Sequence, residues 1–202
     1  MSVGGTRLGR VKTQYYTATT IDGYIADPDN SLEWLFAVGS PGEDGPMTDE
    51  YPTFMAGVGA MAMGSTTYQW IADYTGFLDE PSKWEYTIPT WVFSSRDLPV
   101  PEGLDIRQVR GDVRPVQAEM AAAAGGKNIW LVGGGELVGQ FHDAGLLDEL
   151  ILGVAPVFLG AGAPLLPRRI TPPTLRLTDV TRYGETFVTL RYAVEKPVTS
   201  SQ

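Results

Sequence analysis

The sequence predicts an α/β protein whose central sheet is largely parallel and ends in an antiparallel hairpin. Two observations predict this class. Over residues 12–155, short β-branched, aliphatic or aromatic runs alternate with helical patterns and glycine-rich turns, as expected of strand–helix units in a parallel sheet. Residues 175–194 instead hold two apolar segments around a Tyr-Gly-Glu turn, the second strictly alternating, which favours an antiparallel pair with one solvated face.

The first part of the chain alternates apolar runs with turn formers. Residues 12–20 are β-branched and aromatic and predict a strand, and the following segment to Ser31 is dense in Asp, Asn, Gly and Pro and predicts its exit loop. Ser31 is suited to cap a short helix, and a second helix is expected from about Thr48. The apolar run Val58–Met63 predicts a buried strand.

The rest of the chain repeats this alternation. Apolar or alternating runs predict strands, and an alanine-rich segment stopped by two glycines predicts a helix. The expected elements are a helix after Gly64, strands at 90–94 and 104–109, a helix at 113–124, a strand at 128–132, a helix opening at residues 133–135, a strand from Leu147 and the two strands of the terminal hairpin.

Length and composition indicate one globular domain. The chain has 202 residues, of which 43% are apolar and 19% charged, and a single core suffices at this size. Residues 1–11 and 196–202 are small and polar, so we expect disordered ends around one domain at 12–195.

Charge and residue types exclude several classes of function. The net charge of −9 opposes binding to nucleic acid and to anionic membranes. Cysteine is absent and His142 is the single histidine, so we expect no metal centre and no disulfide. No apolar run approaches the ~20 residues of a membrane-spanning helix, and a cytoplasmic location is the default expectation.

The strongest chemical signal is the run Val132–Glu136, VGGGE, between a buried strand and a helix. Three glycines let the backbone approach a ligand closely, and the amides of a helix N-terminus favour a phosphate. A dinucleotide pyrophosphate would fit there. Glycine runs also occur in plain turns, and this run lacks the GxGxxG pattern of the usual dinucleotide fold.

Two further strand ends carry groups that suit phosphate. GSTT at Gly64–Thr67 offers three hydroxyls where a strand gives way to a helix, although helix capping explains one of them. Ser94–Arg96 follows the apolar strand at 90–94. Ligands of open α/β sheets bind outside the carboxyl ends of the strands, so the three turns together predict one binding site.

These residues also carry a family resemblance. ATTIDGYIADPDNSLEWL from Ala18, MGSTTY from Met63, WVFSS from Trp91, and NIWLVGGGELVGQF followed by LLDELILGVAPVFLGAG resemble the dihydrofolate reductase superfamily, in particular its riboflavin-biosynthesis reductase branch. The resemblance spans about residues 12–194. It implies a dihydrofolate-reductase-like fold with a mixed, mostly parallel sheet flanked by helices, the cofactor NADPH, and a homodimer.

The resemblance assigns cofactor-binding roles to individual residues. Ala18 and Ile25 would lie beside the nicotinamide, and Ser94, Ser95 and Arg96 around the adenosine 2′-phosphate, to which a guanidinium is well suited. The residues placed at the phosphates are Gly64, Ser65, Thr66, Thr67, Gly133, Gly134, Gly135, Glu136 and Leu137. Many relatives have Arg where this chain has Ser65.

The catalytic end is less clearly marked. Asp49 and Glu50 lie near the place of the acidic residue that assists protonation in folate reducers, although acidic residues also favour a helix N-terminus. Asp22 recurs in riboflavin-type relatives, and a turn carboxylate explains it equally well. Trp34 is a candidate wall of the substrate pocket, or a core residue. Gly153 stands where folate reducers keep Thr, which argues against dihydrofolate as substrate.

The sequence therefore predicts an NADPH-dependent reductase that transfers hydride to a C=N or C=O bond of a small heterocyclic or sugar-derived molecule. A phosphoribosylaminopyrimidine such as 5-amino-6-(5-phosphoribosylamino)uracil is the substrate that the resemblance suggests. The alternatives are an NADP-binding protein without turnover of its own, acting as a sensor or subunit, and a dimeric structural protein.

Overall fold

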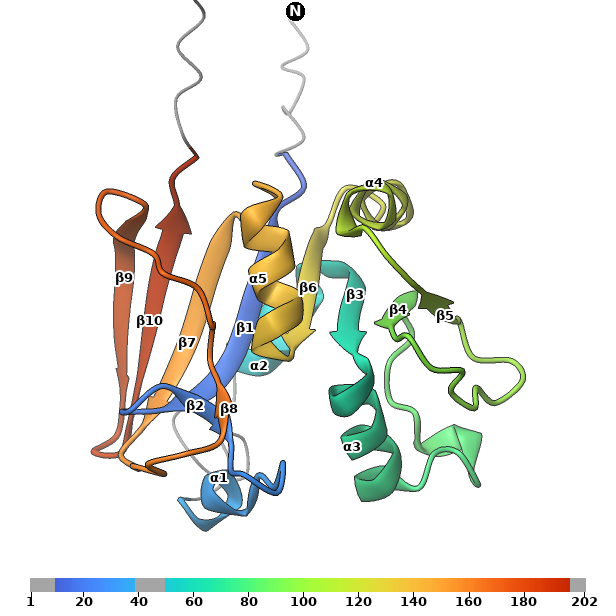
Figure 1. The fold of residues 1–202 in the computed structure, drawn as a ribbon, viewed down its shortest axis with the longest axis horizontal. Helices are drawn as coiled ribbons and strands as arrows, with labels where there is room; N and C mark the ends of the chain where they lie inside the picture. Colours follow the sequence, from blue (N-terminus) through green and yellow to red (C-terminus); the bar gives the residue numbers. More distant parts are fainter. Residues whose placement is uncertain (1–9, 39–49, 197–202) are drawn as a thin grey trace, which may run out of the picture.

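The computed structural model describes residues 10–38 and 50–196, and an eight-stranded sheet forms its centre (Figure 1). The strand order is β5-β4-β3-β6-β1-β7-β10-β9. Its strands are β1 (Thr13–Thr20), β3 (Val58–Gly64), β4 (Thr90–Phe93), β5 (Ile106–Val109), β6 (Asn128–Gly133), β7 (Glu149–Ala155), β9 (Leu175–Tyr183) and β10 (Phe187–Val194). The first six positions are parallel to one another, and β10 pairs antiparallel with both β7 and β9. The predicted fold class is confirmed.

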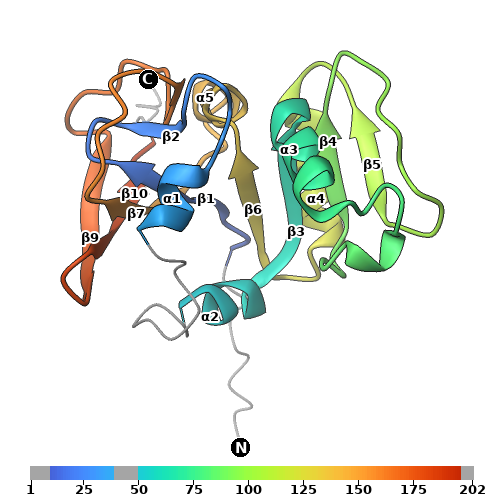
Figure 2. The same cartoon turned by 90° about the horizontal axis from the view of Figure 1, so that it is seen from below.

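Helices cover both faces of this sheet. They are α1 (Glu33–Ala37), α2 (Glu50–Ala56), α3 (Ser65–Thr75), α4 (Val113–Ala123) and α5 (Gly135–Asp143), with a 3₁₀ turn at Pro81–Lys83. Side chains of α4 and α5 join one core cluster, and side chains of α2 and α3 join the other. Figure 2 shows α5 and α2 on opposite sides of the sheet.

Because side chains alternate along each strand, one sheet contributes residues to a core cluster on each of its faces. Ala60 and Ala62 face the α4–α5 side, whereas Met61 and Met63 face the α2–α3 side, because successive side chains of a strand point to opposite faces. The small alanines leave room for the helices above them. Residues of such buried parallel strands are apolar on both faces, which is why β3 reads as an unbroken apolar run.

The sequence analysis missed a second, two-stranded sheet. Residues 21–31 were predicted as a loop, but β2 (Tyr24–Ala26) pairs antiparallel with β8 (Ala163–Pro164). The two segments touch because Gly162 carries no side chain: a Cβ there would lie 2.1 Å from the Ala26 carbonyl oxygen. A three-residue strand paired with a distant segment leaves no periodic signal in the sequence.

No helix within residues 10–38 and 50–196 is long and apolar enough to cross a membrane. In the same residues, no cluster of three or more His, Asp or Glu side chains is arranged to hold a metal ion.

Gly59 sets the distance between β3 and the end of α4. A Cβ at this position would lie 2.0 Å from the Ala124 carbonyl oxygen and 2.9 Å from its Cα, and backbone atoms cannot rotate away. We expect Gly59→Ala to lower the free energy of unfolding by about 2 kcal/mol, a typical penalty for overpacking, as measured by denaturant unfolding. Gly57→Ala is the control, since its Cβ would meet one atom at 3.3 Å. Equal stability of the two variants would contradict the predicted contact.

Candidate active site

A cavity of about 530 Å³ lies beside the carboxyl ends of the parallel strands. Residues of β1, β2, β6, α2, α3 and α5 line it, and the segment around Pro164 and Pro167 borders it. This is the place where ligands bind in open α/β sheets. The cavity brings together residues that are more than 100 positions apart in the sequence.

The turn between β3 and α3 presents free helix amides to this cavity. Gly64 is the N-cap of α3, and no side chain accepts a hydrogen bond from the first turn. The predicted alternative, capping by one of the three hydroxyls, is therefore wrong for Ser65, Thr66 and Thr67. Thr66 and Thr67 instead line the cavity, where hydroxyls and helix amides suit an anion.

The turn between β6 and α5 has the same construction. Gly134 is the N-cap of α5, again without a side-chain cap, and residues 133–136 line the cavity. Gly133 has φ +149°, which favours glycine, and the peptide that follows it is cis. A Cβ on Gly64 would lie 3.8 Å from the Gly134 nitrogen. The two glycine turns are thus direct neighbours.

Gly135 must be glycine for a packing reason. A Cβ there would lie 2.3 Å from the Pro164 carbonyl oxygen and 2.6 Å from that of Leu165. The start of α5 is therefore pressed against the segment that follows β8. Leu137, which the resemblance placed at the cofactor, has its side chain in the core with 6% exposure and does not line the cavity.

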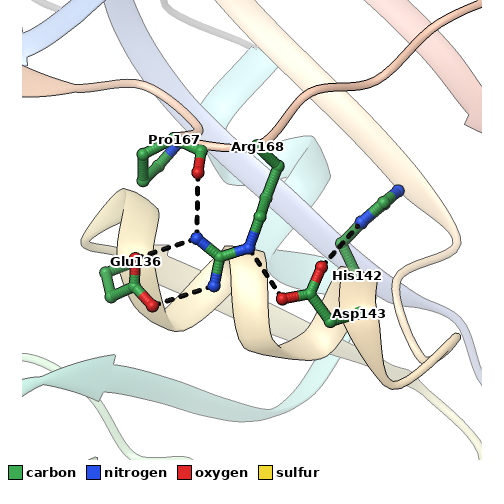
Figure 3. Close-up of polar contacts among 5 residues, drawn as sticks. All are labelled: Glu136, His142, Asp143, Pro167 and Arg168. Atoms are coloured by element: carbon green, nitrogen blue, oxygen red, sulfur yellow. Dashed lines mark hydrogen bonds and ion pairs between the residues drawn. The ribbon is translucent and has the colours of Figure 1, made fainter.

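An ion-pair network fixes the outer side of α5 (Figure 3). Arg168 donates two hydrogen bonds to Glu136, at 2.8 and 2.9 Å, and a third to Asp143 at 2.7 Å. Its guanidinium holds the pKa of both carboxyls below their usual range. Glu136 borders the cavity as a carboxylate already paired with this arginine.

The third predicted turn, Ser94–Arg96, follows β4, which is the sheet neighbour of β3. The Ser94 hydroxyl donates to the Arg96 carbonyl at 2.7 Å and accepts from the Arg96 amide at 3.0 Å. This local loop holds the chain while Ser95 and Arg96 stay exposed. None of the three lines the cavity, but parallel strands place them at its edge of the sheet.

Two further predicted residues belong to the cavity wall. Ala18 of β1 and Ile25 of β2 both line it. Beyond them, the walls become aromatic: Tyr16, Tyr51, Tyr86 and Trp130 line the same cavity. The hydroxyl-bearing rings are buried enough that desolvation raises the pKa of Tyr16, Tyr51 and Tyr86.

The structure shows Asp22 in structural contacts, and its catalytic role stays a prediction. Its carboxylate accepts a hydrogen bond from the Thr20 hydroxyl at 2.5 Å and from the amides of Leu159 and Gly160 at 3.1 and 2.7 Å. It ties the turn after β1 to the segment after β7, and it does not line the cavity. These hydrogen bonds, that from Thr20 foremost, lower the pKa of Asp22.

Glu50 is also committed to packing. It is 9% exposed and accepts hydrogen bonds from Thr189 at 3.0 Å and Arg191 at 3.3 Å, so it joins α2 to β10. It is not among the residues that line the cavity, so nothing in this arrangement supports its prediction as a proton donor. Asp49 lies outside the described residues.

Trp34 belongs to a small core cluster with Ala155 and Phe187 and is 8% exposed. It is not among the residues that line the cavity, and its packing agrees with the core alternative, while its role in a substrate pocket stays a prediction. Residues close to Trp34 do line the cavity: Asn30 and Leu32 precede it in the sequence, and Phe187 belongs to the same core cluster.

Sequence reasoning missed the aromatic wall. Trp130 packs in the core and also lines the cavity. Tyr16, Tyr51 and Tyr86 come from a strand, a helix and a loop, so no spacing links them. The one available signal was Tyr16 itself, which must face away from its buried neighbour Tyr15 because strand residues alternate.

The chain matches the RibD C-terminal domain over residues 12–189. The chain belongs to this family. The resemblance to the riboflavin-biosynthesis reductase branch is thereby confirmed, and family membership indicates a reductase-type domain.

Similar proteins agree with this family. The uncharacterized protein YwjB of Bacillus subtilis is 31% identical over 174 residues, which cover 86% of this chain and 93% of that protein. A protein of Shewanella sp. PV-4 has a similar fold, with TM-score 0.75 and 23% identity. The match covers 92% of this chain and all of the other, whose name provisionally assigns it to riboflavin biosynthesis.

Dihydrofolate reductase itself has the same fold. The Enterococcus faecalis enzyme, solved in complex with NADP(H) and RAB-propyl, gives TM-score 0.56 at 13% identity, covering 93% of this RibD-type chain and 98% of the other. The dihydrofolate-reductase-like architecture is confirmed, and at this identity the comparison shows the fold alone.

The contacts of Asp22 predict a stability effect without a binding effect. Because its pKa is lowered from 3.8, Asp22 stabilises the fold at pH values above this ordinary value, and that contribution disappears as pH falls through the lower folded-state pKa. We expect Asp22→Asn to melt at a lower temperature at pH 7, with the gap from wild type narrowing below pH of about 4. Differential scanning calorimetry over this range measures it.

The exposed Asp29 in the same loop supplies the control Asp29→Asn, which should melt like wild type. If Asp22→Asn melts like wild type at pH 7, the structural role assigned to this carboxylate is refuted.

Proposed function

We propose that this RibD-type chain is an NADPH-dependent reductase that transfers hydride to a C=N or C=O bond of a small ring compound. The observation that supports it most is the pair of glycine-capped helix N-termini that touch each other on the cavity wall. Two sets of unpaired amide donors at one place form a site for a diphosphate rather than for a single anion.

The residues of both turns fit such a group. The amides at the start of α3 and α5 and the hydroxyls of Thr66 and Thr67 would hold the pyrophosphate, and Gly64 keeps the space between the turns open. Ala18 and Ile25 would pack against the nicotinamide end. Glu136 approaches this anion site only as a carboxylate neutralised by Arg168.

Arg96 is the residue proposed to select NADPH over NADH. It is exposed at the end of β4, and Ser94 fixes its backbone. A planar guanidinium with paired donors suits the 2′-phosphate, which is the group that distinguishes the two nucleotides. Ser94 and Ser95 flank it in the same turn.

The cofactor, when bound, supplies the hydride. The chain's own contribution is to orient the acceptor in the cavity and to exclude water from it. With Asp22 and Glu50 held in structural contacts, the proton donors at the cavity are hydroxyls. Tyr51 is the best placed of them, because its ring is 37% exposed and lines the cavity.

A nucleotide-binding protein without turnover is the second candidate. The observation that favours it is the engagement of both described candidate carboxylates, Asp22 and Glu50, away from the cavity. The two functions share the nucleotide site, and they differ in whether NADPH is consumed when an acceptor is added.

Arg96 gives the direct test of the cofactor assignment. We expect NADPH to quench protein fluorescence with an affinity about tenfold higher than that of NADH, about 1.4 kcal/mol, and Arg96→Ala to remove this difference by weakening NADPH alone. The matched control is Arg176→Ala, an equally exposed arginine on β9, which should keep the preference. Absence of binding by either nucleotide would refute the proposed function.

Turnover distinguishes the two candidates. We expect NADPH absorbance to decay faster when the protein and a flat heterocyclic acceptor are both present, and Tyr51→Phe to slow this decay by roughly a hundredfold, the lower range for loss of a general acid, without weakening NADPH binding. Tight NADPH binding without acceleration by any pterin, pyrimidine or aromatic carbonyl compound would favour the binding-only function.

A further inference from the structure

Four aromatic residues of the cavity lining, Tyr16, Tyr51, Tyr86 and Trp130, pack next to one another, and the part of the cavity that they line is called the aromatic chamber below. Trp130 stands edge-on to its neighbours: the Tyr51 and Tyr86 ring centroids lie 6.1 and 6.0 Å away at interplanar angles of 70° and 66°. Tyr16 and Tyr51 are nearly parallel, at 20° and 6.4 Å. Such rings offer flat apolar faces to a ligand, and base-sized rings stack on such faces.

The framework behind the chamber is fixed. The indole nitrogen of Trp130 donates to the Tyr16 carbonyl at 3.0 Å, and Phe54 packs on both rings, with centroids 4.4 Å from Tyr16 and 5.7 Å from Trp130. The walls are therefore held in place by the core. A ligand has to match this shape, because packed side chains do not rearrange at low cost.

The polar groups of the chamber are neutral. Burial raises the pKa of Tyr16 and Tyr86 well above the usual value, and it raises that of Tyr51, where a side-chain hydrogen bond with Tyr86 offsets part of the rise. At pH 7 the three hydroxyls remain protonated. They can donate to or accept from a ring nitrogen, a carbonyl or an amide.

The described residues that line the cavity include no basic side chain. Glu136 is the one ionised side chain among the described residues that line it. The two nearby arginines are already occupied, Arg168 by Glu136 and Asp143, and Arg191 by Glu50. A phosphate or carboxylate carried into the aromatic chamber would lose its hydration and meet neutral rings without a basic side chain to pair with among the described residues that line the cavity, which is unfavourable.

We propose that the aromatic chamber binds the acceptor, as a flat ring compound that is uncharged at neutral pH and carries no phosphate group. The description of this ligand as a hydride acceptor rests on the proposed reductase function. The proposed ligand class differs from the phosphoribosylaminopyrimidine that the family resemblance suggests. Stacking on the aromatic walls supplies affinity, and the hydroxyls of Tyr51 and Tyr86 select rings with hydrogen-bonding atoms.

A pair of isosteric ligands tests the charge preference. Quinoxaline-2-carboxamide and quinoxaline-2-carboxylate share one flat ring and nearly one size, and they differ by a negative charge. We expect the carboxamide to quench tryptophan fluorescence with an affinity at least tenfold higher than the carboxylate, with and without NADPH present. Equal affinities, or tighter binding of the carboxylate, would overturn the charge preference.

Variants locate the binding. Tyr51→Leu removes a wall of the aromatic chamber and should weaken carboxamide binding by about tenfold, a typical loss for one stacking ring. The control is Tyr74→Leu, an aromatic of α3 that is 64% exposed and does not line the cavity. It should bind as wild type does. Equal weakening by both variants, or by neither, would place the ligand elsewhere and overturn the proposal.

The two proposals fail separately. If NADPH binds and the carboxamide does not bind at millimolar concentration, the acceptor class is refuted while the cofactor assignment stands. If the carboxamide binds through Tyr51 and NADPH does not bind, the reductase function is refuted, and with it the description of the ligand as an acceptor.

Discussion

Parallel pairing of β3 with β6 forces two strand-to-helix turns to the same edge of the sheet, because both strands end there. A Cβ on Gly64 would lie only 3.8 Å from the Gly134 nitrogen, so the two helix N-termini point their amides into a common space. Each amide set alone would attract one anion weakly. Together they produce a positive edge in a chain whose net charge is −9, without using a single basic side chain in the cavity wall.

The surrounding contacts keep this edge in place. Gly135 allows α5 to press against the segment after β8, and Arg168 holds the outer side of α5 through Glu136 and Asp143. Asp22 joins the turn after β1 to the segment after β7. Carboxylates near the site thus serve to position backbone, which leaves hydroxyls and amides as the polar groups that a ligand meets. The site is polar beside the two glycine turns and aromatic where Tyr16, Tyr51, Tyr86 and Trp130 line it.

Much of the fold and of the glycine turns was predictable because local patterns encode them. Apolar runs, glycine punctuation and the alternating C-terminal segments fix strands, helices and their order, and parallel strands must collect their turns at one edge. The aromatic chamber was not predictable, because Tyr51, Tyr86 and Trp130 meet only through tertiary packing. Asp22 and Glu50 looked catalytic for a related reason. A carboxylate in a turn or at a helix start has the same local sequence whether its partners are backbone amides or a substrate.

The outermost strand has a consequence for how the molecule behaves in concentrated solution. β9 is the edge of the sheet and spans nine residues, with Leu177 and Val180 about half exposed. A long apolar edge of this kind is a template for strand addition and fibril growth. In β9, charged residues occur at every third position: Arg176, Asp179 and Arg182. A second copy that paired with this strand would therefore have to bury charged side chains. The edge carries its own protection against aggregation in its sequence.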